Sequence, residues 1–302
     1  MSFLLVMKAE IVRSLIIMRR YWFRTLTGMI IGYGMLMVLI AGFMYSQSAE
    51  DAENQGKTPI ERVTPGGMQD RGLLSFEDPE KATNYVLGFI IGMFAFGVVG
   101  MFSQGLKGMA RTGVLEQLCM SPHGLITNFL ARSAVGSVTT VFTSGIMVYL
   151  VTISVGGTLF FYPLEIFVLL GLTFANLLGF GFMVGGLVLV FKQVGQVAIL
   201  IRMGLFGLAL FAREELLQQG WALAAVMHAL PITDAAICLK YVLVKGQMTP
   251  VPGEGAPVFA SVFSTTPFFG LVVSCLVWTM LGVVVFKFME NWSRSKGTLG
   301  AY

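Results

Sequence analysis

The stretch NYVLGFIIGMFAFGVVGMFS, residues 84–103, decides the fold. It runs for about 20 residues without a charged side chain, which is the length an α-helix needs to cross the hydrocarbon core of a bilayer. Lipid offers no partner to backbone N–H and C=O groups, so such a segment satisfies them internally as a helix. The stretch therefore predicts a membrane-spanning helix.

Five further segments are similarly apolar and of comparable length, so we expect six transmembrane helices. The predicted spans are residues 25–45, 84–103, 131–153, 166–190, 195–212 and 267–288. The fifth span is the weakest because Arg202 interrupts it, and a charge inside a span is costly. We predict an all-α integral membrane fold, organised as a single transmembrane domain over residues 1–302.

The composition of the whole chain favours the same class of protein. Hydrophobic residues make up 56% of the 302 residues and charged residues only 12%, whereas a soluble domain carries about a quarter charged residues. So few charges do not cover a water-exposed surface, and lipid must cover much of it. The net charge of +4 lies beside apolar segments, so we interpret it as topology control and expect no nucleic-acid partner.

Lysine and arginine predict the orientation in the cell inner (cytoplasmic) membrane. The residues before the first span carry several bases against one acid, Glu10: Lys8, Arg13, Arg19, Arg20 and Arg24. Cytoplasmic flanks are rich in Lys and Arg, so the N-terminus is predicted inside. The acidic segment 46–83 is predicted outside, and Lys287, Arg294 and Lys296 place the C-terminus in the cytoplasm as well.

Two segments outside the spans also read as helices. In residues 5–22 charged and apolar residues recur at helical spacing, which predicts an amphipathic helix along the cytoplasmic interface; the alternative is a plain basic flank. Residues 216–230 and 232–244 are moderately apolar, too short to cross alone, and split by Pro231. They form either re-entrant helices before the last span, dipping into the outer leaflet, or a pair of surface helices.

The sequence contains no recognisable motif for nucleotide binding, ion coupling, metal binding or catalysis. Gly56-Lys57-Thr58 imitates the end of a phosphate-binding loop, but Asp51 stands where the first glycine is required. No Asp or Glu lies deep in a predicted span, where ion-coupled transporters usually keep one. Only two histidines are present, far apart in the chain. We expect no catalytic residues, no metal site and no cofactor in this chain, which is therefore not predicted to be an enzyme.

The segment KGMARTGVLEQLCMSPHG, residues 107–124, follows the second span and is predicted to face the cytoplasm. Val114, Leu115 and Leu118 fall on one face of a short helix that Ser121-Pro122 ends. An apolar strip on a short helix suits docking in a groove of another protein. The alternative is an amphipathic linker on the membrane surface.

This segment resembles a motif of the ABC-2 type permeases, the membrane subunits of ATP-driven exporters. In that family Gly-Thr-Leu-Glu-x-Leu-x-x-Ser-Pro follows the second span, and here Val114 stands where Thr is common. The family also has an interfacial N-terminal helix, six spans and a Leu-Pro segment before the last span, a place that Leu230-Pro231 occupies here. The likeness covers nearly the whole chain.

The resemblance implies a separate ATP-binding cassette subunit in two copies, which binds ATP and Mg. It implies a homodimer, or a heterodimer with a second permease, in contact with membrane lipid. The coupling helix that contacts the ATPase would comprise Gly113, Val114, Leu115, Glu116, Gln117, Leu118, Ser121 and Pro122. ATP binding would close the ATPase dimer and move this helix.

In the family, spans two and five line the translocation route, which here gives Phe89, Met93, Phe94, Phe96, Met203 and Phe206. Such wide, soft side chains suit an apolar or amphiphilic substrate of the drug, lipid or glycolipid class; ordinary helix packing is the alternative. The predicted function is export of such a substrate from the cytoplasm. An ion-coupled secondary transporter and a non-transporting membrane assembly factor remain as alternatives.

Small residues recur at GxxxG spacing in three of the spans, at Gly28/Gly32, Gly88/Gly92 and Gly181/Gly185. This spacing puts glycines on one helix face, where backbones can approach closely. In a chain with 36 glycines, chance is an equal explanation.

Overall fold

The computed structural model describes residues 22–55, 79–111, 124–155, 159–190, 195–214, 220–249 and 258–296, with shorter pieces at 8–9, 11–13, 15–16, 19–20, 64–65, 74–75, 113–114, 117–118 and 217. The helices are α2 (Trp22–Gln55), α3 (Pro79–Arg111), α5 (Gly124–Val155), α6 (Pro163–Val190), α7 (Gly195–Phe211), α9 (Trp221–Ala229), α10 (Thr233–Leu243), the 3₁₀ helix η2 (Val262–Ser264) and α11 (Thr266–Ser295). Two antiparallel strand pairs, β1 (Thr64–Pro65) with β2 (Leu74–Ser75) and β3 (Met248–Thr249) with β4 (Val258–Phe259), are two residues long each.

The predicted all-α membrane fold is confirmed. Among the described residues, four helices are long and apolar enough to cross a membrane: Thr83–Met109, Leu125–Ser154, Pro163–Val190 and Thr266–Ser295. They contain the predicted second, third, fourth and sixth spans. α2 and α7 contain shorter apolar stretches, Leu26–Val38 and Gln196–Phe211. Helices thus cover the first and fifth predicted spans too, while the count of six crossings stays a prediction.

Four helices, α2, α3, α5 and α11, run well beyond the predicted ends of their spans, α2 and α3 the furthest. α2 continues to Gln55, ten residues past the predicted boundary at residue 45, and α3 begins at Pro79 and ends at Arg111. The extension of α2 is rich in Ala, Glu and Gln, which are good helix formers in water. Polarity marks where a helix leaves lipid but does not end it, so the connection between α2 and α3 is shorter than the predicted 46–83.

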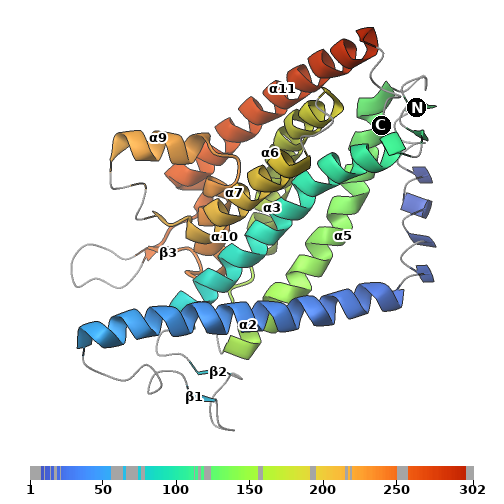
Figure 1. Ribbon diagram of the computed structural model, residues 1–302. Coiled ribbons are helices and arrows are strands. Elements are labelled where there is room, and N and C mark those ends of the chain that lie inside the picture. The colour runs from blue at the N-terminus through green and yellow to red at the C-terminus, as the bar shows by residue number, and fades with distance from the viewer. Residues whose placement is uncertain are drawn as a thin grey trace.

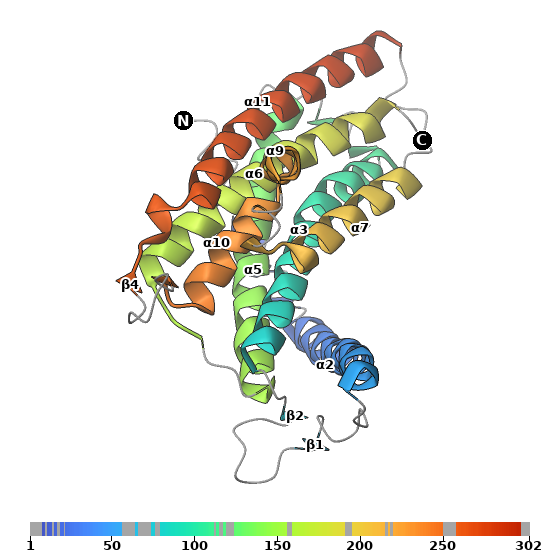
Figure 2. The ribbon, with the colours of Figure 1, turned by 90° about the vertical axis from the view of Figure 1, so that its left-hand side faces the viewer.

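The bundle is built on close backbone contacts between α6 and α11, which lie side by side (Figures 1 and 2). A Cβ atom on Gly282 of α11 would collide with the carbonyl oxygen of Gly179 on α6. The glycines therefore let the two backbones touch, which is how helices associate where water is absent. α3 packs against both α6 and α7.

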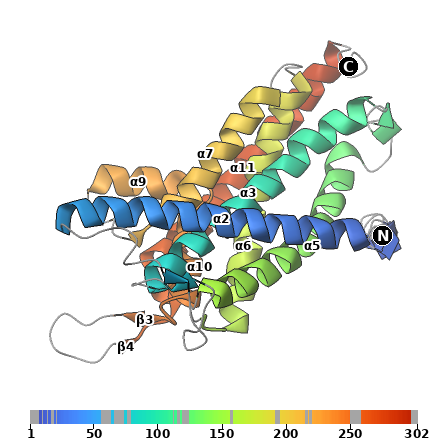
Figure 3. The same cartoon turned by 60° about the horizontal axis from the view of Figure 1, so that its bottom comes forward.

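α2 stands apart from this arrangement. It lies across the other helices instead of alongside them (Figures 1 and 3). Its contact with the bundle is a small apolar cluster in which Leu36 meets Val86 and Ile90 of α3 and Val151 of α5. Tyr33 and Ser154 add one hydroxyl–hydroxyl hydrogen bond of 2.5 Å.

α9 and α10 form the bent pair predicted from Pro231, with 92° between their axes. The two helices differ in how deeply they are buried. α10 is buried over residues 233–242 and belongs to the central core, while α9 exposes Trp221 and Val226 (Figure 2 looks along its axis). The surface-pair alternative therefore fails for α10, because a helix buried on all sides lies inside the bundle.

The described helical pieces of residues 8–20 lie beyond the beginning of α2, at the right of Figure 1. Ile11, Val12, Leu15 and Ile16 are all exposed. The intervening residues of the predicted 5–22 helix lie outside the described residues. An exposed apolar set is what a helix in a membrane interface requires.

Candidate functional site

The predicted coupling helix lies between α3 and α5, and the structure describes four of its residues: Gly113, Val114, Gln117 and Leu118. Leu115, Glu116, Ser121 and Pro122 lie outside the described residues. Gly113 has a φ of 71°, in the left-handed region that glycine adopts without strain. A left-handed glycine directly after a helix is a common helix stop, so Gly113 separates α3 from the helical residues that follow.

The side chains of this segment point in two directions. Val114 and Gln117 are exposed, whereas Leu118 is partly buried against an apolar cluster of the bundle. The docking interpretation placed Val114 and Leu118 on one shared face, but here Leu118 contacts the chain's own helices. Val114 and Gln117 are therefore the described positions open to a partner.

The cluster that receives Leu118 joins the helices of the bundle. Its buried members come from α3, α5, α6 and α11, and Phe182 of α6 packs edge-on against both Phe102 of α3 and Phe286 of α11, at 4.9 and 5.3 Å between ring centroids. Phe102, Phe182 and Phe286 are fully buried. Close-packed side chains transmit displacement, so a shift of Leu118 would act on all four of these helices through the cluster.

α3 and α7, the two helices that the resemblance assigns to the route, pack through glycines. A Cβ on Gly92 would lie 2.9 Å from the carbonyl oxygen of Phe206, and one on Gly100 would collide with the guanidinium of Arg202. The Gly88/Gly92 spacing thus meets α7, so it has a packing role. Gly28, in contrast, has open space around it.

Arg202 crosses this interface. Its Nε donates a 2.8 Å hydrogen bond to the carbonyl oxygen of Phe96, and its guanidinium carbon lies 3.6 Å from the centre of the Phe96 ring. The side chain is buried. A cation–π contact and a carbonyl partially replace the water that a buried cation loses, so Arg202 binds α7 to α3.

The six predicted route residues do not share one surface. Phe89 and Phe206 pack edge to face between α3 and α7, with centroids 5.0 Å apart. Met93 and Met203 are exposed, whereas Phe94 is buried in the central core. Phe96 lies beneath Arg202.

Phe89 and Met93 line a cavity of about 380 Å³ between α2, α3 and α5. One wall is apolar, with Met35 and Leu36 of α2 among its residues. The α5 wall carries hydroxyls, from Thr139, Thr140, Thr143 and Ser144. A soft apolar wall facing a hydroxyl wall suits a molecule with both kinds of surface.

Two buried charges of α10 escaped prediction. Lys240 Nζ donates to the carbonyl oxygens of Ala209, Leu210 and Ala212, at 3.2, 3.3 and 2.9 Å. These carbonyls lie at the end of α7, where a helix has unpaired acceptors and a partial negative charge. Lys240 therefore caps α7 from inside the bundle.

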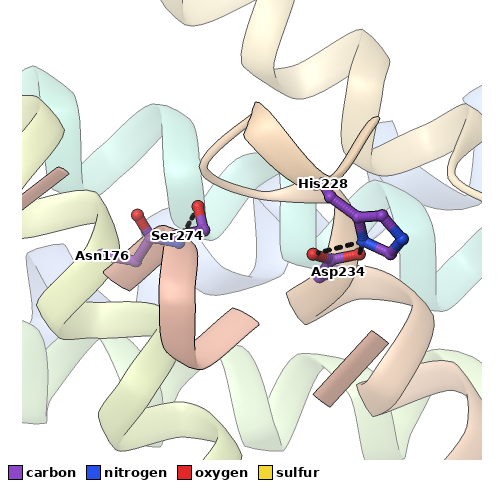
Figure 4. A network of polar contacts seen from close by, with 4 residues as sticks. All are labelled: Asn176, His228, Asp234 and Ser274. Carbon is purple, nitrogen blue, oxygen red and sulfur yellow. Dashed lines mark hydrogen bonds and ion pairs between the residues drawn. The ribbon is translucent and has the colours of Figure 1, made fainter. Parts of the chain in front are cut away.

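The second charge, Asp234, is paired with His228 across the bend (Figure 4). His228 Nδ1 lies 2.8 and 3.0 Å from the two carboxylate oxygens. Gly270 of α11 makes room for the pair, since a Cβ there would collide with Asp234. Trp278 Nε1 donates to the carbonyl oxygen of Ala229, and Asn176 donates to Ser274 nearby (Figure 4).

The sequence contains one signal for this pair: a histidine and an aspartate six residues apart, either side of a proline. A proline-centred bend brings such flanking residues together. Lys240 has no comparable local signal, because its partners are 28 to 31 residues away.

Comparison with known proteins adds one match. The family model described as ABC-2 type transporter matches residues 6–244, which is most of the chain. The matched region includes every candidate residue of the coupling segment and of the route. No curated protein and no solved structure matches the chain.

Proposed function

Because the chain belongs to the ABC-2 type transporter family, the membrane component of ABC transporters, we propose that it is the permease subunit of an ATP-driven exporter. The match over residues 6–244 carries this proposal. The substrate is apolar or amphiphilic, of the drug, lipid or glycolipid class, and moves out of the cytoplasm. A separate ATP-binding subunit in two copies binds ATP and Mg, and the permease pairs with a second permease, identical or related.

In this proposal the segment 113–122 contacts the ATP-binding subunit in the cytoplasm. Gly113 frees the segment from the rigid helix α3, and Leu118 anchors it on the apolar cluster. Movement of the ATP-binding subunit then pushes on α3, α6 and α11 together. The exposed Val114 and Gln117 form part of the contact with the ATP-binding subunit.

The cavity beside Phe89 and Met93 supports the substrate class. It combines methionines, which adapt to varied shapes, with the hydroxyl wall of α5 and has no charged lining residue. Met93 and Met203 expose soft surface on α3 and α7. Together they suit amphiphiles of differing shape, without a fixed ionic anchor.

The experiment is reconstitution with a separate P-loop ATPase that co-purifies with this chain. The two proteins are purified together, placed in liposomes, and tested for ATP-dependent movement of fluorescent amphiphiles, with liposomes holding the ATPase alone as control. The proposal expects movement that requires ATP and both proteins. Gradient-driven movement without nucleotide would indicate a secondary transporter, and binding without movement would indicate an assembly factor; either result contradicts the proposal.

A further inference from the structure

A second cavity, of about 520 Å³, lies on a different face of α3 from the one that meets α7. α3, α5, α6, α10 and the segment 159–162 enclose it. Its floor is formed by Leu87 and Phe94 of α3 and Leu239 of α10, all buried. Its volume lies within the range of about 300–1,000 Å³ that small-molecule sites occupy.

The cavity reaches the protein surface between α5 and the segment 159–162. Tyr149 of α5 and Phe161 of the 159–162 segment line it, and they are 62% and 79% exposed. Both belong to the part of the bundle that the sequence places near the outer face. A molecule dissolved in the bilayer can therefore enter between α5 and this segment without crossing the bundle.

The lining selects against charge. None of the lining residues is acidic, basic or histidine, and most are aliphatic or aromatic. A charged group placed there would lose its water without gaining a partner. The occupant is therefore uncharged where it lies in the cavity.

One polar group in the wall lacks a partner. Thr152 is 2% exposed, and its Oγ1 makes no hydrogen bond. Other hydroxyls of α5 bond back to the helix: Thr143 donates to the carbonyl of Thr139 and Ser154 to that of Leu150, at 2.8 Å each. A buried hydroxyl without a partner is unfavourable, and an occupant with a hydrogen-bonding group would relieve this.

We propose that this cavity binds the hydrocarbon part of an uncharged amphiphile, whose ester or hydroxyl group pairs with the Thr152 hydroxyl. The site is complete within one copy of the chain. It includes the predicted route residue Phe94 but lies between α3 and α5, away from the contact of α3 with α7. It does not depend on ATP-driven transport, so binding and transport can fail independently. A membrane lipid and an exported compound share this chemistry.

Photolabelling tests the site directly. The purified full-length chain is exposed to a monoacylglycerol with a diazirine in its acyl chain, irradiated and digested for mass spectrometry. Label is expected on residues 141–153 and 239–243. Label spread evenly over the lipid-facing helices, α11 included, would overturn the proposal.

Two glycines supply a matched pair of variants. Gly145 lines the cavity and Gly171 does not, yet both are exposed and a Cβ at either meets no atom within 4 Å. Gly145→Phe fills the cavity and is expected to abolish the specific label, while Gly171→Phe leaves it unchanged. Undiminished labelling of Gly145→Phe would contradict the site.

Thr152→Val tests the hydrogen bond while keeping the shape. The proposal expects about three- to tenfold weaker binding of the monoacylglycerol, the effect of one neutral hydrogen bond, and unchanged binding of a diazirine alkane. Thr173→Val is the control, because the Thr173 hydroxyl already donates to the carbonyl oxygen of Leu169 at 2.6 Å. This variant is expected to bind both probes as the unaltered protein does. An equal loss for the two probes in Thr152→Val would refute the polar contact.

Competition identifies the source of the occupant. If compounds that stimulate ATP hydrolysis by the reconstituted transporter displace the probe, the site holds exported cargo. If only extracted membrane lipids displace it, the site holds lipid. Displacement by neither would overturn the proposal.

Discussion

Buried charged side chains of this chain hold neighbouring helices together through hydrogen bonds. Lys240 is 9% exposed and gives three hydrogen bonds to the last carbonyls of α7, and Arg202 ties α7 to α3 at its other contact. α7 is shorter than the other predicted spans. Two cations hold it in place, Lys240 at its end and Arg202 at its contact with α3. A charge inside a membrane bundle is costly unless paired, and both of these cations have partners.

Lys240→Met is expected to destabilise the protein by about 2 kcal/mol, because three carbonyls at the end of α7 lose their donor. Lys245→Met is the matched control: its partner Glu214 lies 3.2 Å away, but both side chains are about half exposed. Such a pair contributes about 0–1 kcal/mol. The measurement is the thermal unfolding midpoint in detergent, and equal shifts for the two variants would contradict the capping role.

At the scale of elements, the positions of the helices were predictable and their ends were not. Apolar length alone places a helix wherever lipid is the solvent, so each predicted span coincides with a helix. The end of α2 at Gln55 was missed because acidic residues continue a helix in water. The burial of α10 was missed because it depends on packing against α3, α6 and α11, which local sequence does not encode.

The contact between α3 and α7 gives an element-scale prediction. Gly92→Ala places a methyl group against the backbone of Phe206 and is expected to destabilise by about 1–3 kcal/mol, as overpacking does. Gly97→Ala, on the same helix with open space around it, is expected to stabilise by about 0.5–1 kcal/mol. Unfolding midpoints that shift in the same direction for both variants would contradict the close approach of α3 and α7.

For the whole molecule, Leu118 links the segment 113–122 to the bundle. The motif in 113–122 was readable from sequence, as was its apolar character. The inward direction of Leu118 was not, because a short helical segment shows which residues share a face but not which neighbour covers them.

Leu115→Asp tests the coupling at this scale. A carboxylate on the docking strip is expected to abolish ATP-dependent transport, because the partner's groove would have to desolvate the charge. Membrane insertion and the unfolding midpoint should stay close to those of the unaltered protein. Full ATP-dependent transport by this variant would show that Leu115 is not part of the contact with the ATP-binding subunit.

The most direct measurement is the labelling of Cys119 by a membrane-impermeant maleimide in the variant Cys238→Ala/Cys275→Ala, whose two replaced thiols are buried. The control is Ser75→Cys in a chain without other cysteines, which reports on the segment 46–83 that is predicted outside. The account predicts that Cys119 reacts only in inverted vesicles and that added ATP-binding subunit slows the reaction. Labelling of Cys119 in intact cells, or labelling that the ATP-binding subunit leaves unchanged, would contradict it.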